Sequence, residues 1–217
     1  MFVGHGVLAF VLVAWLCRAR DLPVGRALAL GVLAAAFATL PDVDMLYAPL
    51  GLVGSVGSLA GASAAFWEAA AHVHRSVTHS LVVAGLATVA VGAWLLPAPA
   101  VGVGSVRVAA PRLFALALGG SLVGVALVTA GPVGATIMAV FLAGAFGLAS
   151  VADRRGIPPV GVVGAAGVGL ATHPFGDLLT GEPPALLYPL DVALLESRIV
   201  LAADPTVNLL LAFFVEL

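Results

Sequence analysis

The sequence predicts an all-α fold: one domain over residues 1–217, built as a polytopic integral membrane bundle of about six to seven transmembrane helices. The first observation is composition, because 62% of the residues are hydrophobic, 9% are charged and the mean hydropathy is +1.17. A soluble domain carries about 25% charged residues, since its surface faces water. The second is a series of apolar runs of spanning length, and the third is the absence of an internal repeat or domain boundary. Lipid must therefore be the main solvent of this chain.

Apolar runs define the candidate helices, since a span needs about 20 mostly apolar residues. The five clearest runs are 2–17, 24–40, 80–96, 113–130 and 133–151. Gly131-Pro132 divides the last two, because their combined stretch is too long for one crossing and Gly-Pro is a turn signal. A sixth run, 160–172, is short, and the sequence leaves open whether the C-terminal run 207–217 crosses the membrane.

Two long connections join these runs and hold most of the polar residues. The segment 41–79 is apolar but rich in Gly and Ser, and residues 59–73 are predicted to form an interfacial helix with Phe66 and Trp67 at headgroup level. The segment 173–206 contains five prolines and most of the remaining acids.

The arginines predict the orientation of the bundle. With these spans, one side receives seven arginines and the other receives only Arg75 and Arg198. The seven are Arg18, Arg20, Arg26, Arg107, Arg112, Arg154 and Arg155. An excess of arginine marks the cytoplasmic side, so the chain is expected to be a multi-pass cell-membrane protein with these residues inside. The first run has no basic segment before it, which favours a retained helix with its N-terminus outside over a signal peptide.

Charge and cysteine content exclude two other features. The formal net charge is −2 and the sequence has no basic tail or patch, so nucleic-acid binding is not expected. The single cysteine, Cys17, excludes an intramolecular disulfide.

All five histidines and a set of acids fall on the arginine-poor side. They come from four segments: the start of the first run, the Leu-Pro-Asp-Val-Asp after the second, the segment before the third and the segment after the sixth. In chain order these residues are His5, Asp42, Asp44, His72, His74, His79, His173 and Asp177. Ionisable groups at membrane depth are costly, so a function is the default hypothesis for such a cluster.

The residue types predict a metal site. Imidazole and carboxylate together suit zinc, manganese or iron, and two carboxylates can bridge two metals in a hydrolytic site. Pro41 stops the preceding helix and lets the following turn direct Asp42 and Asp44 to a shared point.

Local patterns predict how the other candidates are held. Thr78 or Ser76 is expected to cap the helix that follows the histidine pair. His173 and Asp177 have i, i+4 spacing, so both side chains share a face if the segment is helical with Pro174 in its first turn.

Four motifs occur in order: an N-terminal His, Pro-Asp-x-Asp, His-Arg-x-x-Thr-His-Ser, and His-x-x-x-Asp followed by Gly and Pro-Leu. In this chain they are His5, residues 41–44, residues 74–80, residues 173–177, Gly181 and Pro189-Leu190. Together they resemble the YdjM-like family of membrane-bound metal-dependent hydrolases, some of them LexA-regulated, over nearly the whole chain. A fainter similarity is to zinc-dependent phospholipase C and related nucleases, which implies phosphoester chemistry. The insert 174–176 departs from the family pattern and leaves open whether His173 is helical or at a cap.

The predicted metal ligands are seven side chains from these motifs. They are His5, Asp42, Asp44, His74, His79, His173 and Asp177. Asp44 is also a candidate catalytic base that deprotonates water, and Arg75 is a candidate catalytic residue toward an anionic substrate or transition state. The alternative for Arg75 is contact with a lipid headgroup. The sequence leaves open whether His72 and Glu68 join the site.

The predicted function is metal-dependent hydrolysis of an ester or phosphoester at the outer membrane face. One or two divalent ions, with zinc preferred over manganese or iron, would lower the pKa of a bound water toward about 7. The expected partners are membrane lipids, with a lipid or lipid-linked phosphoester as substrate. Two other classes stay open: a divalent-metal transporter, which needs polar groups near the midplane, and a non-catalytic protein in which metal ties loops together.

Overall fold

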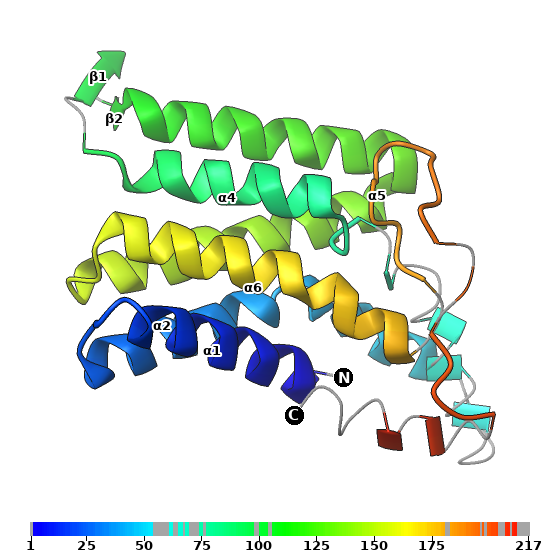
Figure 1. Ribbon diagram of the computed structural model, residues 1–217. Helices are drawn as coiled ribbons and strands as arrows, with labels where there is room; N and C mark the ends of the chain where they lie inside the picture. The colour runs from blue at the N-terminus through cyan, green and yellow to red at the C-terminus, as the bar shows by residue number, and fades with distance from the viewer. Residues whose placement is uncertain are drawn as a thin grey trace.

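The structure is a computed structural model, which describes residues 2–53, 61–62, 65–66, 68–69, 74–75, 77–97, 100–103, 106–180, 183–195, 197, 199–203, 207–208 and 210–211. Its helices with assigned bounds are α1 (Phe2–Arg18), α2 (Val24–Ala38), the 3-10 helix η1 (Pro41–Leu52), α4 (Leu81–Leu95), α5 (Ala110–Arg154) and α6 (Pro159–Thr180). The predicted all-α class is right for this bundle (Figure 1). The C-terminal run and the interfacial segment 59–73 lie largely outside the described residues.

A short antiparallel hairpin between α4 and α5 was not predicted. It consists of β1 (Ala100–Val103) and β2 (Val106–Ala109), and Val101 is paired with Val108. Valine recurs at every second position of both strands, and a β-branched residue in that pattern favours an extended chain. Each strand has only four residues, so neither forms an apolar run of helix length.

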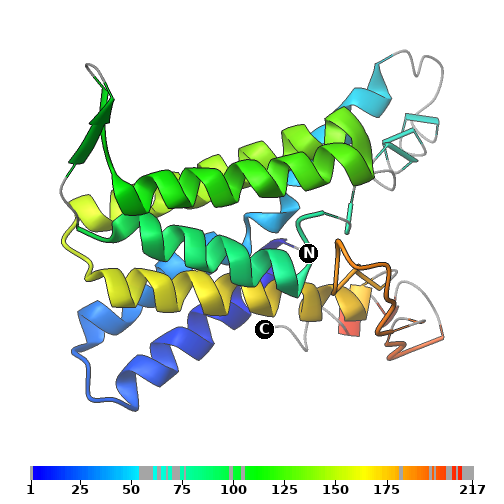
Figure 2. The ribbon, with the colours of Figure 1, turned by 90° about the horizontal axis from the view of Figure 1, so that it is seen from above.

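The helix α5 is a helical hairpin rather than one straight rod. Gly131 within it has φ +68 and ψ −168, and Pro132 follows. Glycine adopts positive φ at little cost, and proline lacks the N–H that would continue the hydrogen-bond ladder. The chain reverses here, and the two arms run side by side in both views (Figures 1 and 2). The predicted division at Gly131-Pro132 is therefore confirmed.

The helix α6 lies in the middle of the bundle and connects its two halves. It contacts α1, α2 and α4, while α5 packs mainly on α4. Only glycine fits at position 169, because a Cβ there would lie 2.9 Å from Phe37 Cβ and 3.0 Å from the Ala38 backbone nitrogen. This close approach places the turn of α6 that follows Gly169 beside the end of α2.

Among the described residues, one helix, Ala110–Arg154, is long and apolar enough by composition to cross a membrane. The count rises to two if Val24–Ala38 and Pro41–Pro49, which meet at a bend of 48°, form one span. The helices α1 and α4 are also apolar but shorter. The bundle of six to seven spans therefore stays a prediction.

The two ends of the bundle differ in chemistry. The α1–α2 turn, the β1–β2 hairpin and the α5–α6 turn share one end (Figure 1), and the segments around them carry the seven arginines. The opposite end holds η1, the segment before α4 and the C-terminal part of α6. This second end contains the candidate site.

Candidate metal centre

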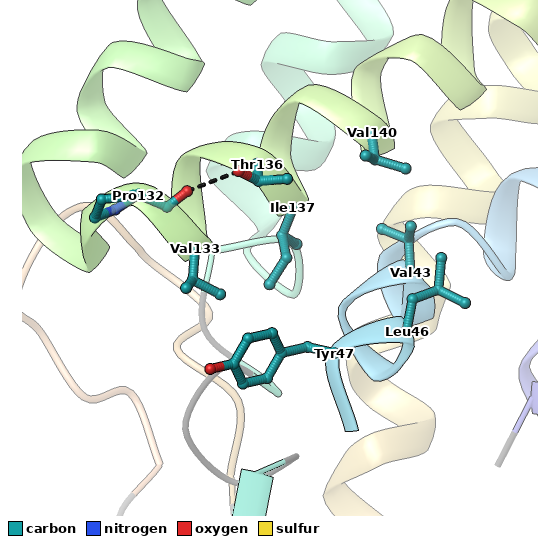
Figure 3. A pocket seen from close by; sticks show the side chains of 8 residues that line it. All are labelled: Val43, Leu46, Tyr47, Pro132, Val133, Thr136, Ile137 and Val140. Carbon is teal, nitrogen blue, oxygen red and sulfur yellow. Dashed lines mark hydrogen bonds between the residues drawn. The ribbon is translucent and has the colours of Figure 1, made fainter. Parts of the chain in front are cut away.

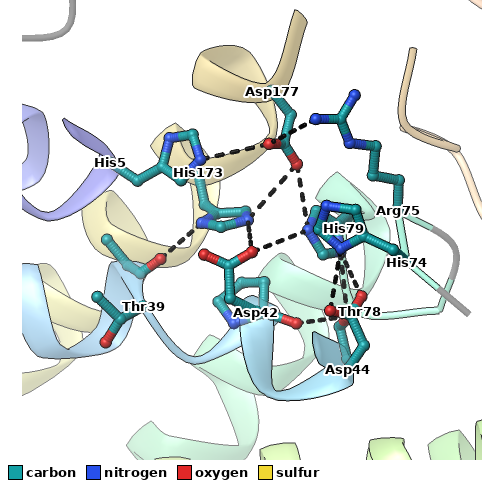
Figure 4. Close-up of polar contacts among 12 residues, drawn as sticks. His5, Thr39, Asp42, Asp44, His74, Arg75, Thr78, His79, His173 and Asp177 are labelled. Atoms are coloured by element: carbon teal, nitrogen blue, oxygen red, sulfur yellow. Dashed lines mark hydrogen bonds and ion pairs between the residues drawn. The ribbon is translucent and has the colours of Figure 1, made fainter. Parts of the chain in front are cut away.

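Four chain segments bring their polar side chains together at one end of the bundle (Figure 4). One residue comes from α1, two come from η1, two precede α4 and two come from the last turns of α6. They are His5, Asp42, Asp44, His74, His79, His173 and Asp177, the seven predicted ligands. All are buried except His74, which is 19% exposed through its side chain.

The helix α6 supplies two of these residues because it continues beyond its apolar run. The predicted end of the sixth run at residue 172 is wrong, since α6 extends to Thr180. Pro174 lies inside this helix rather than in the first turn of a new one. His173 and Asp177 therefore lie one turn apart on one helical face, and His173 is not at a cap. Its Nδ1 lies 2.6 Å from the Ala38 carbonyl oxygen, so this nitrogen donates its proton to α2 and Nε2 faces the cluster.

The 3-10 helix η1 supplies the two aspartates. α2 ends before Pro41, and the chain bends there by 48° into η1 rather than into an irregular turn. Side chains one position apart in a 3-10 helix point about 120° apart, so the aspartates and the intervening Val43 face different directions. Asp42 and Asp44 both point into the cluster (Figure 4).

The segment before α4 is held by hydroxyl groups whose roles differ from the prediction. The N-cap of α4 is Ser80, whose Oγ accepts from the backbone nitrogens of Val82 and Val83. Thr78, one of the two predicted caps, instead donates to the Pro41 carbonyl at 2.9 Å, and the other, Ser76, lies outside the described residues. An N-cap hydroxyl must directly precede the first helical turn. Because α4 begins only at Leu81, Ser80 takes this role instead of Thr78.

The hydroxyl of Thr78 also fixes the orientation of its neighbour. Its oxygen lies 3.1 Å from His79 Nδ1. Because Thr78 donates its proton to Pro41, it accepts the bond from Nδ1–H, and His79 directs Nε2 toward the cluster. Thr78 therefore orients His79, whereas the sequence predicted it as a helix cap.

Four donor atoms face one another at the centre of the cluster. His79 Nε2 lies 3.1 Å from Asp177 Oδ2 and 3.7 Å from Asp42 Oδ1, and His173 Nε2 lies 3.6 Å from Asp42 Oδ1 and 3.7 Å from Asp177 Oδ2. Ligands at about 2.1 Å from one ion are about 3 to 3.5 Å apart in tetrahedral or octahedral geometry. These four donors therefore have nearly the spacing that one divalent metal requires.

Hydrogen bonding gives a second, independent indication that the donors fit a metal. Within the described part of the chain, Asp42 Oδ2 and the Nε2 atoms of His79 and His173 are buried and make no hydrogen bond. Buried polar atoms nearly always have a partner, and buried charges are paired or coordinate metals. The other ring nitrogen of each histidine is already engaged, which leaves the inward nitrogens to coordinate an ion. This buried His/Asp cluster can bind a metal.

His5 extends the central group. Its Nε2 lies 3.3 Å from Asp177 Oδ1 and its ring lies 4.3 Å from that of His173, centroid to centroid. His5, Asp42 and His173 offer ligand atoms that all lie within 4.8 Å of one another. His5 thus adjoins the central donors through Asp42, His173 and Asp177.

Asp44 and His74 form an outer layer. Asp44 lies 3.0 Å from His74 Nδ1 and 3.4 Å from His79 Nδ1, on the opposite side of the His79 ring from the four central donors. A carboxylate in that place orients a ligating imidazole. With Asp42 and His79, the same two residues also make a group within 4.8 Å that could hold a metal ion.

Burial and charge act in opposite directions on His79. Burial lowers the pKa of a histidine, but the adjacent Asp177 and Asp42 carboxylates raise the pKa of His79 to about 9. The charge of Asp44 acts in the same direction. A cation is therefore favoured at this position, whether it is a proton on the imidazole or a metal ion beside it.

Arg75 lies at the rim of the cluster in a strained conformation. Its φ is +66, which is uncommon for a residue other than glycine and is held in place here by the backbone bond from Ala185 N to its carbonyl. Its Nη2 is 3.4 Å from Asp177 Oδ1, and its side chain is 15% exposed. The guanidinium therefore lies between the buried carboxylate and the outside. Of the two open candidates, His72 lies outside the described residues, and Glu68 is exposed.

A family model described as YdjM inner membrane protein matches residues 1–216. No curated protein and no solved structure matches the chain.

Proposed function

The chain belongs to the YdjM inner membrane protein family, and we propose that it is a multi-pass, metal-dependent hydrolase of esters or phosphoesters. The observation that carries the proposal is the convergence of two imidazole nitrogens and two carboxylates at 3.1–3.7 Å, in which the Nε2 atoms of His79 and His173 make no hydrogen bond among the described residues. Such a donor set suits zinc, manganese or iron.

The residues of the cluster divide into proposed metal ligands and residues that orient those ligands. His5, Asp42, His79, His173 and Asp177 would hold the first ion, and Asp44 with His74 would complete a second position. A bound divalent metal supplies a Lewis acid that polarises the ester and makes water acidic enough to attack near neutral pH. The support comes from the Ala38 carbonyl, Thr78 and Asp44, each of which engages the outward nitrogen of a histidine.

In this proposal the outer layer, Asp44 and His74, transfers the protons. The water oxygen forms a bond to the carbonyl carbon or phosphorus, and the ester C–O or P–O bond breaks. Asp44 would accept the proton of a water that lies on its own side of the His79 ring, and His74, at 3.0 Å from that carboxylate, would transfer it to the leaving oxygen. Arg75 faces the negative charge that develops on the substrate. The products are an acid and an alcohol, so atoms and protons balance.

Several features support a multi-pass arrangement. At 1.5 Å per residue, each arm of α5 is about 30 Å long, which matches the hydrocarbon core of a bilayer. Large apolar side chains cover the outside of the bundle, for example Trp15 at 65%, Val128 at 86% and Val160 at 80% exposure. The arginine-rich end would lie in the cytoplasm and the metal centre on the extracytoplasmic side.

The alternative functions lack comparable support. A transporter needs polar groups along a path, but the described hydroxyls of Thr88, Ser121, Thr129 and Thr136 all bond to carbonyls of their own helices. A structural zinc site is usually closed by four ligands, whereas the cluster here holds seven candidate ligands in three overlapping groups. The cluster therefore favours a catalytic site, with lipids or lipid-linked esters as the substrates nearest to it.

The test combines metal analysis with hydrolysis. Detergent-purified wild type is compared with His79→Ala, Asp42→Ala and the exposed-acid control Asp153→Ala, each supplied with zinc or manganese. Wild type and control are expected to bind one or two equivalents and to hydrolyse a carboxylic ester or a phosphoester, while both site variants lose metal and turnover. Wild type that binds less than one equivalent and hydrolyses none of these substrates would contradict the proposal.

A further inference from the structure

An apolar pocket lies on the face of η1 that turns away from the metal-binding cluster. It has a volume of about 360 Å³ and is lined by Val43, Leu46, Tyr47, Pro132, Val133, Thr136, Ile137 and Val140 (Figure 3). Its walls come from η1 and from the second arm of α5. The hydroxyl of Thr136 donates its proton to the Pro132 carbonyl, and apart from the hydroxyls of Thr136 and Tyr47 the lining side chains are hydrocarbon.

The pocket and the cluster share one structural wall. Val43, Leu46 and Tyr47 of η1 line the pocket (Figure 3), while Asp42 and Asp44 of the same helix point into the cluster (Figure 4). The two sites are therefore separated by one helix width, on the order of 10 Å.

The second wall also reaches the cluster. Val77, which lies between the two histidines of the motif, is buried, and its Cγ1 is 3.7 Å from the position of a Cβ at Gly134 of α5. Gly134 adjoins Val133, a pocket residue. The same stretch of α5 thus packs on the histidine segment and lines the pocket.

We propose that this pocket holds one hydrocarbon chain of the substrate, which makes the substrate a single-tailed or multi-tailed amphiphile with its ester or phosphoester at the metal centre. The inference rests on the proposed hydrolase function and deepens it. A polar, cation-binding cluster beside a pocket with an apolar lining matches a molecule with a polar head and an apolar tail. The pocket opens at the outer surface, where Leu46 is 70% and Val140 is 45% exposed, so a tail can enter from surrounding lipid.

Two variants of the same helix provide a matched test. Val140→Trp fills the pocket mouth, whereas Val151→Trp places the same side chain at 49% exposure three turns further along the same face of α5. Both positions are exposed valines, so the added indole is expected to affect folding and membrane contact similarly at the two sites. Neither residue belongs to the metal-binding cluster.

The first measurement is hydrolysis of alkyl p-nitrophenyl phosphate diesters with ethyl, hexyl and dodecyl chains. Burial of each methylene contributes enough to change affinity about fourfold, so dodecyl is expected to have a KM at least about tenfold below that of ethyl. Val140→Trp should remove this preference and keep turnover of the ethyl ester, while Val151→Trp keeps both. Hydrolysis with the same KM for all chains overturns the inference and leaves the proposed function intact, whereas no hydrolysis of any ester contradicts the proposed function.

The second measurement needs neither metal nor turnover. A dodecyl phosphate with a diazirine on the chain is photolysed with the metal-free protein, and labelled peptides are mapped. Labelling concentrated in residues 43–47 and 132–140, competed by dodecyl phosphate and reduced in Val140→Trp, supports the inference. Labels spread over all outward faces and not competed would show ordinary surrounding lipid, and would overturn it.

Discussion

At the scale of single residues, the metal centre depends on which nitrogen of each histidine faces inward. His173 donates Nδ1–H to the Ala38 carbonyl and His79 donates Nδ1–H to Thr78, so both direct Nε2 to the centre. Free imidazole has no such preference, because either nitrogen can carry the proton. The supporting oxygens thus determine which nitrogen each histidine offers to an ion.

Asp44 and Asp42 lie two positions apart on η1 and are expected to respond differently to substitution. Asp44→Asn should keep the ion at the central position but weaken its binding about 10-fold to 100-fold, because Asp44 contacts the outward nitrogen of His79. Asp42→Asn should lose the metal, since its oxygen faces the two inward nitrogens. Metal titration of both variants measures this difference. Equal and complete loss of the central ion in both would make Asp44 a direct ligand of that ion.

The raised pKa of His79 predicts that metal and proton compete. With a pKa of about 9, the imidazole is protonated at pH 7 when no metal is bound and must release that proton to coordinate an ion. Apparent metal affinity should rise about tenfold per pH unit between pH 7 and 9, and level off above 9. Calorimetric titration in buffers of different ionisation enthalpy measures the released proton. An affinity that stays constant over this range would contradict the assignment.

At the scale of elements, the site depends on how closely α6 approaches α2. Gly169 lies against the α2 backbone at Phe37 and Ala38, and His173 bonds to the Ala38 carbonyl one turn later. A larger residue at 169 must push the helices apart and so lengthen that bond. The distance between two helices thus controls the orientation of a ligand.

Gly169→Ala is therefore expected to weaken metal binding at least about tenfold and to destabilise the fold by about 1–3 kcal/mol through overpacking. Gly164→Ala is the control, because a Cβ at Gly164 of the same helix meets nothing within 4 Å. That control should bind metal normally and be equally or slightly more stable, since alanine favours a helix over glycine. Thermal unfolding and metal titration report the two effects. Unchanged metal affinity in Gly169→Ala would show that the approach of α6 does not position His173.

At the scale of the whole molecule, polar chemistry is separated between the two ends of the bundle. The seven arginines belong to the end with the α1–α2 turn, and the His/Asp cluster belongs to the other (Figure 1). Arginine is retained in the cytoplasm during insertion. This separation predicts that the cluster lies on the extracytoplasmic side of the membrane.

Cysteine labelling tests the orientation. Leu190 lies in the loop near the cluster and is 59% exposed. In a Cys17→Ser background, Leu190→Cys is expected to react with a membrane-impermeant maleimide in intact spheroplasts. Arg155→Cys, at the α5–α6 turn, should react only after lysis. The reverse pattern would place the metal centre in the cytoplasm and would leave its geometry unchanged.

The sequence alone was sufficient for features that depend on composition or on adjacent residues. Apolar runs predicted α1, α2 and α4, and Gly131-Pro132 predicted the reversal within α5, because positive φ and a missing N–H act locally. The motif positions also named the seven residues that meet in the cluster. The sequence did not reveal the β1–β2 hairpin or the extension of α6 past Pro174, since both depend on weak local preferences.

Only the tertiary structure decided which atom of each residue faces the centre, which residues are supports and where the apolar pocket lies. Thr78, the Ala38 carbonyl and the pocket lining come from contacts between segments as far apart as positions 38 and 173. Residue type and spacing fix what a side chain can do chemically. The packing of distant helices fixes its direction, and metal binding depends on direction because ligand atoms must converge within about 2 Å of one point.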